Sequence, residues 1–235
     1  MHVVRRAIIM AAGFGKRMNP ITSNTPKPLI RIKGVRMIDT IILGLKKNGI
    51  EEIYVVVGYL REQFGCLVDE YGVKLIDNPL YSSSNNISSL YFAREYLENS
   101  IIIDGDQIIY NEKVLSPYFE KSCYNAVSIS DETKEWVLQV RNGSVVSCSR
   151  TGGTNGWQLY SISRWTGEDG RRLRAHLEDD FVGNENSQLY WDDVVLFRHF
   201  SDYDLGVFPM SKNDVVEIDD YSELVRIDSS YRFIK

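Results

Sequence analysis

Residues Ala7–Leu29 read AIIMAAGFGKRMNPITSNTPKPL, and this stretch predicts both a strand and a ligand site. The apolar run Ala7–Met10 has the pattern of a buried strand, and it leads into a loop with glycines at positions 13 and 15. Glycine allows positive φ and has no Cβ, so successive backbone N–H groups can point at phosphate oxygens. Arg17 adds a fork of donors that fits phosphate, and Lys27 adds a compact positive charge. We therefore predict a nucleotide site whose loop residues are Ala11, Ala12, Gly13, Phe14, Gly15 and Lys16.

The spacing of this loop excludes two commoner glycine-rich phosphate sites. A dinucleotide fingerprint needs a third small residue where Met18 stands, followed by a helix that Pro20 disfavours. A Walker loop needs Ser or Thr after Gly-Lys, and this chain has Arg17 there. A simple turn would explain the glycines but not the whole pattern. That pattern resembles the signature of nucleotidyltransferases that make NDP-sugars and CDP-alcohols: Gly13-x-Gly15-x-Arg17-Met18-x-Pro20, then Pro26-Lys27-Pro28-Leu29.

The composition is that of an ordinary globular protein. The chain has 235 residues, of which 43% are hydrophobic, enough for one or two domains. A net charge of −5 argues against a nucleic-acid surface and suits a substrate that carries a cation. No apolar stretch is long enough to span a membrane, and the basic N-terminus does not make a secretion signal, so we expect a cytoplasmic protein. Neither the cysteines nor the histidines are spaced as a metal cluster: Cys66, Cys123, Cys148, His2, His176 and His199.

Strand and helix patterns alternate through the first half of the chain. This alternation predicts an α/β fold with a doubly wound, mostly parallel sheet. Ligands of such sheets bind beyond the carboxyl ends of the strands, where Gly13, Gly58, Asn78 and Asp106 are expected. We expect strands at Pro28–Ile32, Glu52–Val57, Val73–Ile76 and Ile101–Ile103, and helices at Val35–Asn48, Arg61–Tyr71 and Asn86–Leu97.

The pattern changes to short strands after about Pro117. Asn142-Gly143 predicts a tight hairpin turn, and Gly152-Gly153 predicts a flexible loop. We interpret residues 1–235 as one domain, in which about 1–117 bind the nucleotide and about 118–235 form an elaborated half with a small β-rich portion for a second substrate. The expected strands are Asn125–Ser130, Trp136–Val140, Val145–Cys148, Trp157–Ile162, Leu205–Met210 and Val215–Ile218, and the expected helices are Glu168–Leu177, Gln188–Phe200 and Tyr221–Arg226.

Two acidic segments are candidates for binding a metal. Asp104 and Asp106 follow a buried strand, and Glu217 and Asp219 face one way if their segment is extended. Mg²⁺ prefers one or two carboxylates together with phosphate oxygens and water. A capped turn also explains the first segment, and a helix N-cap at Asp219 or Asp220 also explains the second. Beside a phosphate loop we favour metal binding, with one aspartate capping the helix and the other on the metal.

Aromatic residues beside carboxylates suggest the nature of the second substrate. Trp136 follows Glu135, and Tyr190 and Trp191 precede Asp192. The faces of Trp and Tyr rings attract a quaternary ammonium group, and a nearby carboxylate adds Coulomb attraction. Core packing is the simpler explanation for either tryptophan taken alone.

Six segments spread over essentially the whole chain resemble bacterial CTP:phosphocholine cytidylyltransferases. They are Met10–Leu29, Val57–Phe64, Asn85-Asn86 with Ser89–Tyr91, Glu135-Trp136, Leu189–Asp192 and Glu217–Asp219. The resemblance implies a Rossmann-like sheet, CTP and phosphocholine as substrates, and Mg²⁺ as cofactor. It implies Asp106 and Asp219 as metal ligands, Arg17 and Lys27 on the phosphates, and Trp136 and Tyr190 in an aromatic pocket for the trimethylammonium group.

The predicted reaction is transfer of CMP from CTP to phosphocholine, with in-line attack of the acceptor phosphate and release of pyrophosphate. We expect Arg17, Lys27 and Asp106 to be catalytic. The further expected nucleotide-binding residues are Gly58, Tyr59, Asn78, Ser88, Ser89 and Asp104. The expected acceptor-binding residues are Glu135, Trp136, Tyr190, Trp191 and Asp192.

Other acceptors and one other class of function remain open. Asp193 stands at a position where the family usually has Asn, and Gly105 stands where the family usually has Ala. The additional carboxylate leaves 2-aminoethylphosphonate and phosphoethanolamine as alternatives, because a primary ammonium needs hydrogen-bond acceptors. A sugar phosphate fits the aromatic residues less well. A non-catalytic nucleotide-sensing subunit is the alternative from another class. The sequence leaves open whether the chain forms a homodimer or belongs to a larger fusion.

Overall fold

The computed structural model describes residues 1–183 and 186–233. Its helices are α1 (Met37–Lys47), α2 (Gly65–Tyr71), α3 (Ile87–Phe92), α4 (Gly167–Glu178), α5 (Trp191–Asp193) and α6 (Tyr221–Ile227). Its strands are β1 (His2–Val3), β2 (Arg6–Ala11), β3 (Arg31–Ile32), β4 (Val35–Arg36), β5 (Glu52–Val57), β6 (Lys74–Asp77), β7 (Ser100–Asp104), β8 (Gln107–Ile109), β9 (Tyr118–Phe119), β10 (Cys123–Ile129), β11 (Val137–Arg141), β12 (Ser144–Ser149), β13 (Gly156–Trp165), β14 (Gly206–Pro209) and β15 (Val215–Glu217). No helix among these residues is long and apolar enough to cross a membrane.

Four parallel strands form the centre of the main sheet, in the order β6-β5-β2-β7. Ile9 of β2 lies opposite Val55 of β5 and Ile103 of β7. Alternate side chains of β2 enter different layers: Ile9 packs in the core that holds α1 and α2, and Ile8 packs in the core that holds α3 and α4. The prediction of an α/β fold with a mostly parallel central sheet is confirmed. The strand order reverses between β2 and β7, which is where such sheets bind ligands.

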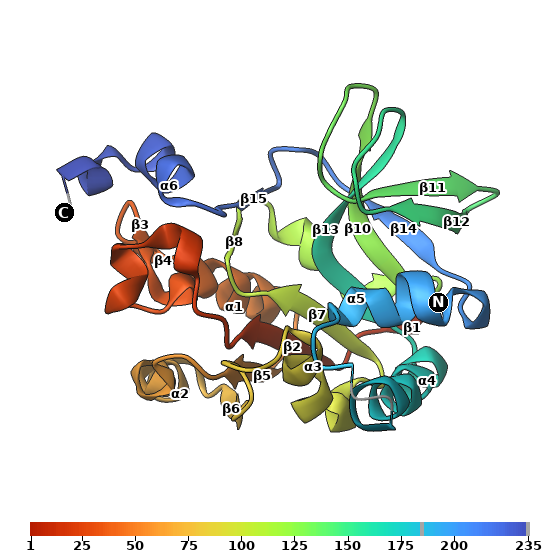
Figure 1. Ribbon diagram of the computed structural model, residues 1–235, viewed down its shortest axis with the longest axis horizontal. Coiled ribbons are helices and arrows are strands. Elements are labelled where there is room, and N and C mark those ends of the chain that lie inside the picture. Colours follow the sequence, from red (N-terminus) through yellow and green to blue (C-terminus); the bar gives the residue numbers. More distant parts are fainter. Residues whose placement is uncertain (184–185, 234–235) are drawn as a thin grey trace.

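The second half of the chain extends this sheet with mainly antiparallel strands. β13 pairs antiparallel with β7, and it also pairs with β10 and β11 (Figure 1). The predicted hairpin turn joins β11 to β12, with positive φ at Asn142 and Gly143. Strands from both predicted halves therefore share one sheet, and a division near residue 117 remains an interpretation.

The C-terminal segment returns to the nucleotide-binding half. β15 pairs antiparallel with β8, so that Glu217 lies opposite Gln107. Ile218 and Leu224 are buried in a small core with Met18 and Ile30, and Figure 1 shows α6 near β3 and β4. This packing brings residues near position 219 beside the turn that follows β7.

Three local predictions were wrong in detail. The predicted helix Gln188–Phe200 begins at Trp191, because the Asp193 carboxylate accepts from the Tyr190 backbone N–H, and it continues as a π-helix over Val194–Arg198. The predicted strand Pro28–Ile32 is a 3₁₀ turn followed by the two-residue β3. The loop at Gly152-Gly153 is held rather than free, because Gly153 exchanges two backbone hydrogen bonds with Thr133.

Candidate active site

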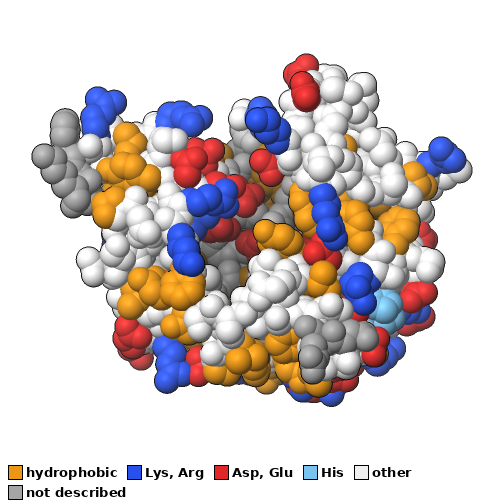
Figure 2. Space-filling view, in the orientation of Figure 1, with side chains coloured by type: hydrophobic (Ala, Val, Ile, Leu, Met, Phe, Trp, Pro, Cys, Tyr) orange, Lys and Arg blue, Asp and Glu red, His pale blue; other side chains and the backbone are white. Residues whose placement is uncertain are grey.

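The loop after β2 and the turn after β7 enclose a hollow of about 390 Å³ at the carboxyl edge of the parallel strands. Figure 2 shows it near the middle of the viewed face, with acidic and basic side chains around it. Gly15 has φ 61°, and a Cβ there would lie 3.0 Å from the Lys27 Cβ. Gly13 does not have a positive φ, which corrects the prediction for that residue. The predicted residues that line the hollow are Ala11, Ala12, Gly13, Gly15, Lys16, Arg17, Lys27, Ser89, Asp104, Asp106 and Asp219.

Lys27 is a buried cation that joins the two acidic segments. Its Nζ lies 2.6 Å from Asp106 Oδ2 and 3.4 Å from Asp219 Oδ1. Arg17 Nη2 lies 2.8 Å from the same Asp219 oxygen. Burial disfavours the charged ammonium, but attraction to Asp106 and Asp219 outweighs this and raises the pKa of Lys27. Lys27 is therefore a fixed positive charge at the floor of the hollow.

Asp106, Glu217 and Asp219 are suited to hold a divalent cation. Each offers a carboxylate oxygen, and these oxygens lie within 4.8 Å of one another. Asp106 Oδ1 is buried and has no hydrogen-bond partner in the described part of the chain. Burial, together with the neighbouring carboxylates, raises the pKa of Glu217. An all-oxygen set of this kind fits a hard cation.

The second acidic segment contains the predicted helix cap, and the metal-binding role of its other aspartate stays a prediction. Asp220 Oδ1 accepts a hydrogen bond of 2.9 Å from the Glu223 backbone N–H and caps α6, whereas Asp219 faces the acidic cluster. Glu217 joins Asp219 there, as the alternation of side chains in an extended segment indicates, although the resemblance implies only Asp106 and Asp219 as metal ligands.

A second hollow of about 300 Å³ adjoins the first. The rings of Trp136 and Tyr190 lie there with centroids 6.1 Å apart and at 83°, and Tyr190 is 50% exposed. Burial raises the pKa of Asp192 in the same wall to about 7. Five residues line both hollows: Arg17, Asn86, Asp104, Asp106 and Asp219. The other residues of the second hollow are Glu135, Leu159, Ser161 and Glu217.

Trp191 does not line this second hollow, which corrects the prediction that it binds the acceptor. Its ring is 2% exposed and packs at 6.1 Å from Tyr124 and 6.0 Å from Trp165. Its backbone N–H donates to Asn86 Oδ1 at 2.9 Å, which fixes the start of α5. Asp193 also points elsewhere, because it pairs with Arg150 at 2.5 Å.

The further residues expected to bind the nucleotide do not line the first hollow, apart from Ser89 and Asp104. Gly58, Tyr59 and Asn78 surround a separate hollow. The Asn78 amide donates to the Ser88 and Ser89 hydroxyls at 3.0 and 2.9 Å. Phe14 packs against Tyr59, whose hydroxyl donates to the Thr22 carbonyl at 2.8 Å. These contacts hold the loop, and a role of these residues in nucleotide binding stays a prediction.

Asn86 is a residue that the sequence argument did not assign to the site. It lines both hollows and also positions α5. The sequence signal for a role of Asn86 in the site was the Asn85-Asn86 pair at the start of the predicted helix Asn86–Leu97.

Comparisons with known proteins agree with this geometry. The MobA-like NTP transferase domain family matches residues 7–175. The chain is 38% identical over 231 residues to the 2-aminoethylphosphonate cytidylyltransferase of Lancefieldella rimae. This alignment covers 97% of this chain and 94% of the relative. The chain is also 34% identical over 225 residues to the choline-phosphate cytidylyltransferase of Streptococcus pneumoniae. That alignment covers 94% of this chain and 97% of the relative.

A solved structure of the CTP:phosphocholine cytidylyltransferase from Streptococcus pneumoniae has a TM-score of 0.90 and 33% identity to this chain. The match covers 97% of this chain and 99% of that one. Both the sequence and the structural match therefore extend through the two adjoining hollows. The chain belongs to the MobA-like NTP transferase family and is a nucleotidyltransferase that stands among the cytidylyltransferases of that family.

Proposed function

We propose that this protein transfers CMP from CTP to a small acceptor with a phosphate or phosphonate at one end and an amino or ammonium group at the other. The observation that carries the proposal is the wall shared by the two hollows. It consists mainly of acidic residues, with the phosphate loop on one side and Trp136 and Tyr190 on the other. The reacting phosphates would meet at this wall while the cationic headgroup occupies the aromatic hollow.

The chain's own groups position the reactants and neutralise charge. Backbone N–H groups at residues 12–15, together with Arg17, bind the β- and γ-phosphates that leave as pyrophosphate. Lys27 neutralises the α-phosphate as charge develops during in-line attack by the acceptor oxygen. No covalent enzyme intermediate is needed, because the two bound substrates are held in adjoining sites.

Asp106, Glu217 and Asp219 are the residues that would hold Mg²⁺. When bound, the ion would add positive charge beside the phosphates of both substrates.

Phosphocholine is our first candidate acceptor, because the two rings offer faces to a quaternary ammonium and Asp192 offers a charge. 2-Aminoethylphosphonate is the second candidate, favoured by one observation. Asp192 Oδ1 is buried without a hydrogen bond of normal geometry among the described residues, although the Tyr124 hydroxyl interacts with the same carboxyl group. Of the two headgroups, only the primary ammonium has N–H groups to donate to it. The relative with 38% identity is named for the same substrate.

Pyrophosphate release with CTP, Mg²⁺ and each acceptor tests the proposal. We expect turnover with phosphocholine or 2-aminoethylphosphonate and none with a sugar 1-phosphate. Trp136→Leu should reduce kcat/KM most for a quaternary acceptor, and Asp192→Asn most for a primary one. CTP binding without pyrophosphate release from any aminoalkyl acceptor would identify a sensor and end the proposal.

Asp106→Asn should lower kcat by about 100-fold or more, because it removes a charge at the shared wall. Asp131→Asn is the control, since Asp131 is exposed and lies outside both hollows. Circular dichroism and the melting temperature would show that both variants fold. Full activity of a folded Asp106→Asn protein would remove Asp106 from the mechanism.

A further inference from the structure

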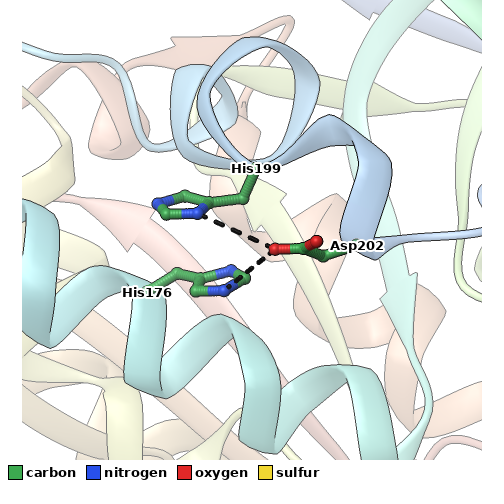
Figure 3. A group of neighbouring side chains, drawn as sticks. All are labelled: His176, His199 and Asp202. Atoms are coloured by element: carbon green, nitrogen blue, oxygen red, sulfur yellow. Dashed lines mark ion pairs between the residues drawn. The ribbon is translucent and has the colours of Figure 1, made fainter.

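Two of the three histidines meet on the face of the molecule formed by the C-terminal end of α4 and the segment after α5. His176 lies in α4, and His199 follows the π-helix Val194–Arg198. Their rings are parallel within 10° with centroids 3.8 Å apart, and Asp202 faces the edges of both (Figure 3). The sequence had predicted scattered histidines, and this convergence corrects that prediction.

The ligand atoms of this group converge on one point at the surface. Asp202 Oδ2 lies 3.5 Å from His176 Nε2 and 3.9 Å from His199 Nδ1. All three ligand atoms lie within 4.8 Å of one another. Ligand atoms of a tetrahedral zinc-type ion lie about 3.3–3.5 Å apart. Because each nitrogen lone pair lies in its ring plane and the two rings are parallel, at least one ring must rotate out of the stack for both to bind one ion.

The other nitrogen of each ring is already held by an outer group. His199 Nε2 lies 3.2 Å from Asp180 Oδ2, and Asp180 is fully buried and also accepts from Arg198 at 2.7 Å. An N–H at Nε2 leaves the lone pair at Nδ1, on the side of Asp202. His176 Nδ1 lies 2.8 Å from the Tyr203 hydroxyl, which leaves Nε2 on the same side. Such outer hydrogen bonds are typical of metal-binding histidines.

The charge at this position also favours a cation. Asp202 contributes a carboxylate, and the two histidines contribute ring nitrogens of the kind that binds transition metals. A bound divalent ion would link the three groups through coordination bonds.

We propose that His176, His199 and Asp202 form a second metal site, separate from the acidic cluster of the active site, that binds Zn²⁺ or another first-row transition ion. Imidazole ligands select such ions, whereas the all-oxygen cluster selects Mg²⁺. The three ligands leave the fourth position to water. A bound ion would join α4 to the segment that begins at α5, and would stabilise the folded protein by linkage.

Titration of the full chain with Co²⁺ in excess Mg²⁺ tests this proposal, because Mg²⁺ keeps the acidic cluster occupied. We expect one Co²⁺ per chain with visible absorption bands of a tetrahedral site, and a melting temperature that Zn²⁺ raises. His199→Ala should abolish both effects. Asp202→Asn, at an exposed position that tolerates change, should weaken Co²⁺ binding at least about tenfold. Asp180→Asn should weaken it by about 10–100-fold through the orientation of His199.

Two variants serve as matched controls. His2→Ala removes the third histidine, which is exposed and belongs to β1, and should leave Co²⁺ binding unchanged. Asp106→Asn should also leave it unchanged. The proposal is wrong if the wild type shows no such bands, if Asp106→Asn abolishes the binding, or if His2→Ala weakens it as much as His199→Ala does. Binding that needs His199 but neither His176 nor Asp202 would overturn the ligand set, because Asp179 and Asp180 would then hold the ion.

Discussion

At the scale of single residues, the site is built from charged groups whose neighbours decide their state. Lys27 keeps its proton because two carboxylates lie within 3.4 Å of its Nζ. Asp192 is the opposite case, because burial raises the pKa of its carboxyl to about 7. The second hollow, which Asp192 lines, is therefore more negative above pH 7 than below it.

Asp192 should make stability depend on pH. In the unfolded chain an aspartate has a pKa of about 3.9, well below the value of about 7 in the folded protein. As pH rises from about 4 to 7, the unfolded chain loses this proton while the folded protein keeps it, so the folded state becomes less stable. The full contribution to stability is present below about pH 4.

Urea unfolding at about pH 5 and about pH 8 would measure the loss. We expect a smaller loss for Asp192→Asn than for the wild type, because asparagine does not titrate. Equal losses in the two proteins would contradict the raised pKa.

At the scale of elements, the second hollow, which contains Trp136 and Tyr190, depends on how one loop is anchored. Gly152 has φ 83°, and a Cβ there would lie 1.9 Å from the Thr133 carbonyl oxygen. This close approach holds the segment that carries Glu135 and Trp136. The sequence predicted a flexible loop at this glycine pair, but in the structure the pair is fixed against the segment that precedes β11.

Gly152→Ala should lower the free energy of unfolding by at least about 1–2 kcal/mol, because alanine is strained at this φ and collides with the backbone. It should also raise KM for the acceptor several-fold and leave CTP binding unchanged. Gly153→Ala is the matched control, since nothing lies within 4 Å of its added Cβ. We expect it to change stability by less than about 0.5 kcal/mol. Equal effects of the two substitutions on KM would rule out this anchoring role.

At the scale of the whole molecule, the chain closes its active site with its own C-terminal segment. The pairing of β15 with β8 and the burial of Ile218 bring Asp219 to Asp106 and Lys27. Binding of Mg²⁺ and CTP should therefore stabilise the entire fold, since the ligands are held by both ends of the chain.

Mg²⁺ at about 100 times its Kd should add about 2.7 kcal/mol to the stability of the CTP complex. Asp219→Asn should remove most of the rise in melting temperature caused by Mg²⁺. Asp220→Asn should retain that rise, because Asn also caps helices well and Asp220 faces α6 instead of the cluster. If Asp220→Asn lost the Mg²⁺ effect and Asp219→Asn kept it, the assignment of the two residues would have to be exchanged.

Several parts of this protein could be predicted from the amino-acid sequence because their signals are local. The apolar run of β2, the left-handed Gly15 and the Asn142-Gly143 turn were predictable, because backbone sterics and the alternation of side chains act over a few residues. The placement of Arg17 and Lys27 beside the loop after β2 followed from the same short segment.

The meeting of side chains that are distant in the sequence could be seen only in the folded protein. It placed Asp106, Glu217 and Asp219 together, and it stacked His176 on His199. It also separated Tyr190, in the hollow, from Trp191, in the core. The physical reason is that these outcomes depend on strand pairing and on the point where a helix begins. Both are set by packing between segments far apart in the chain, and periodicity along the sequence does not encode them.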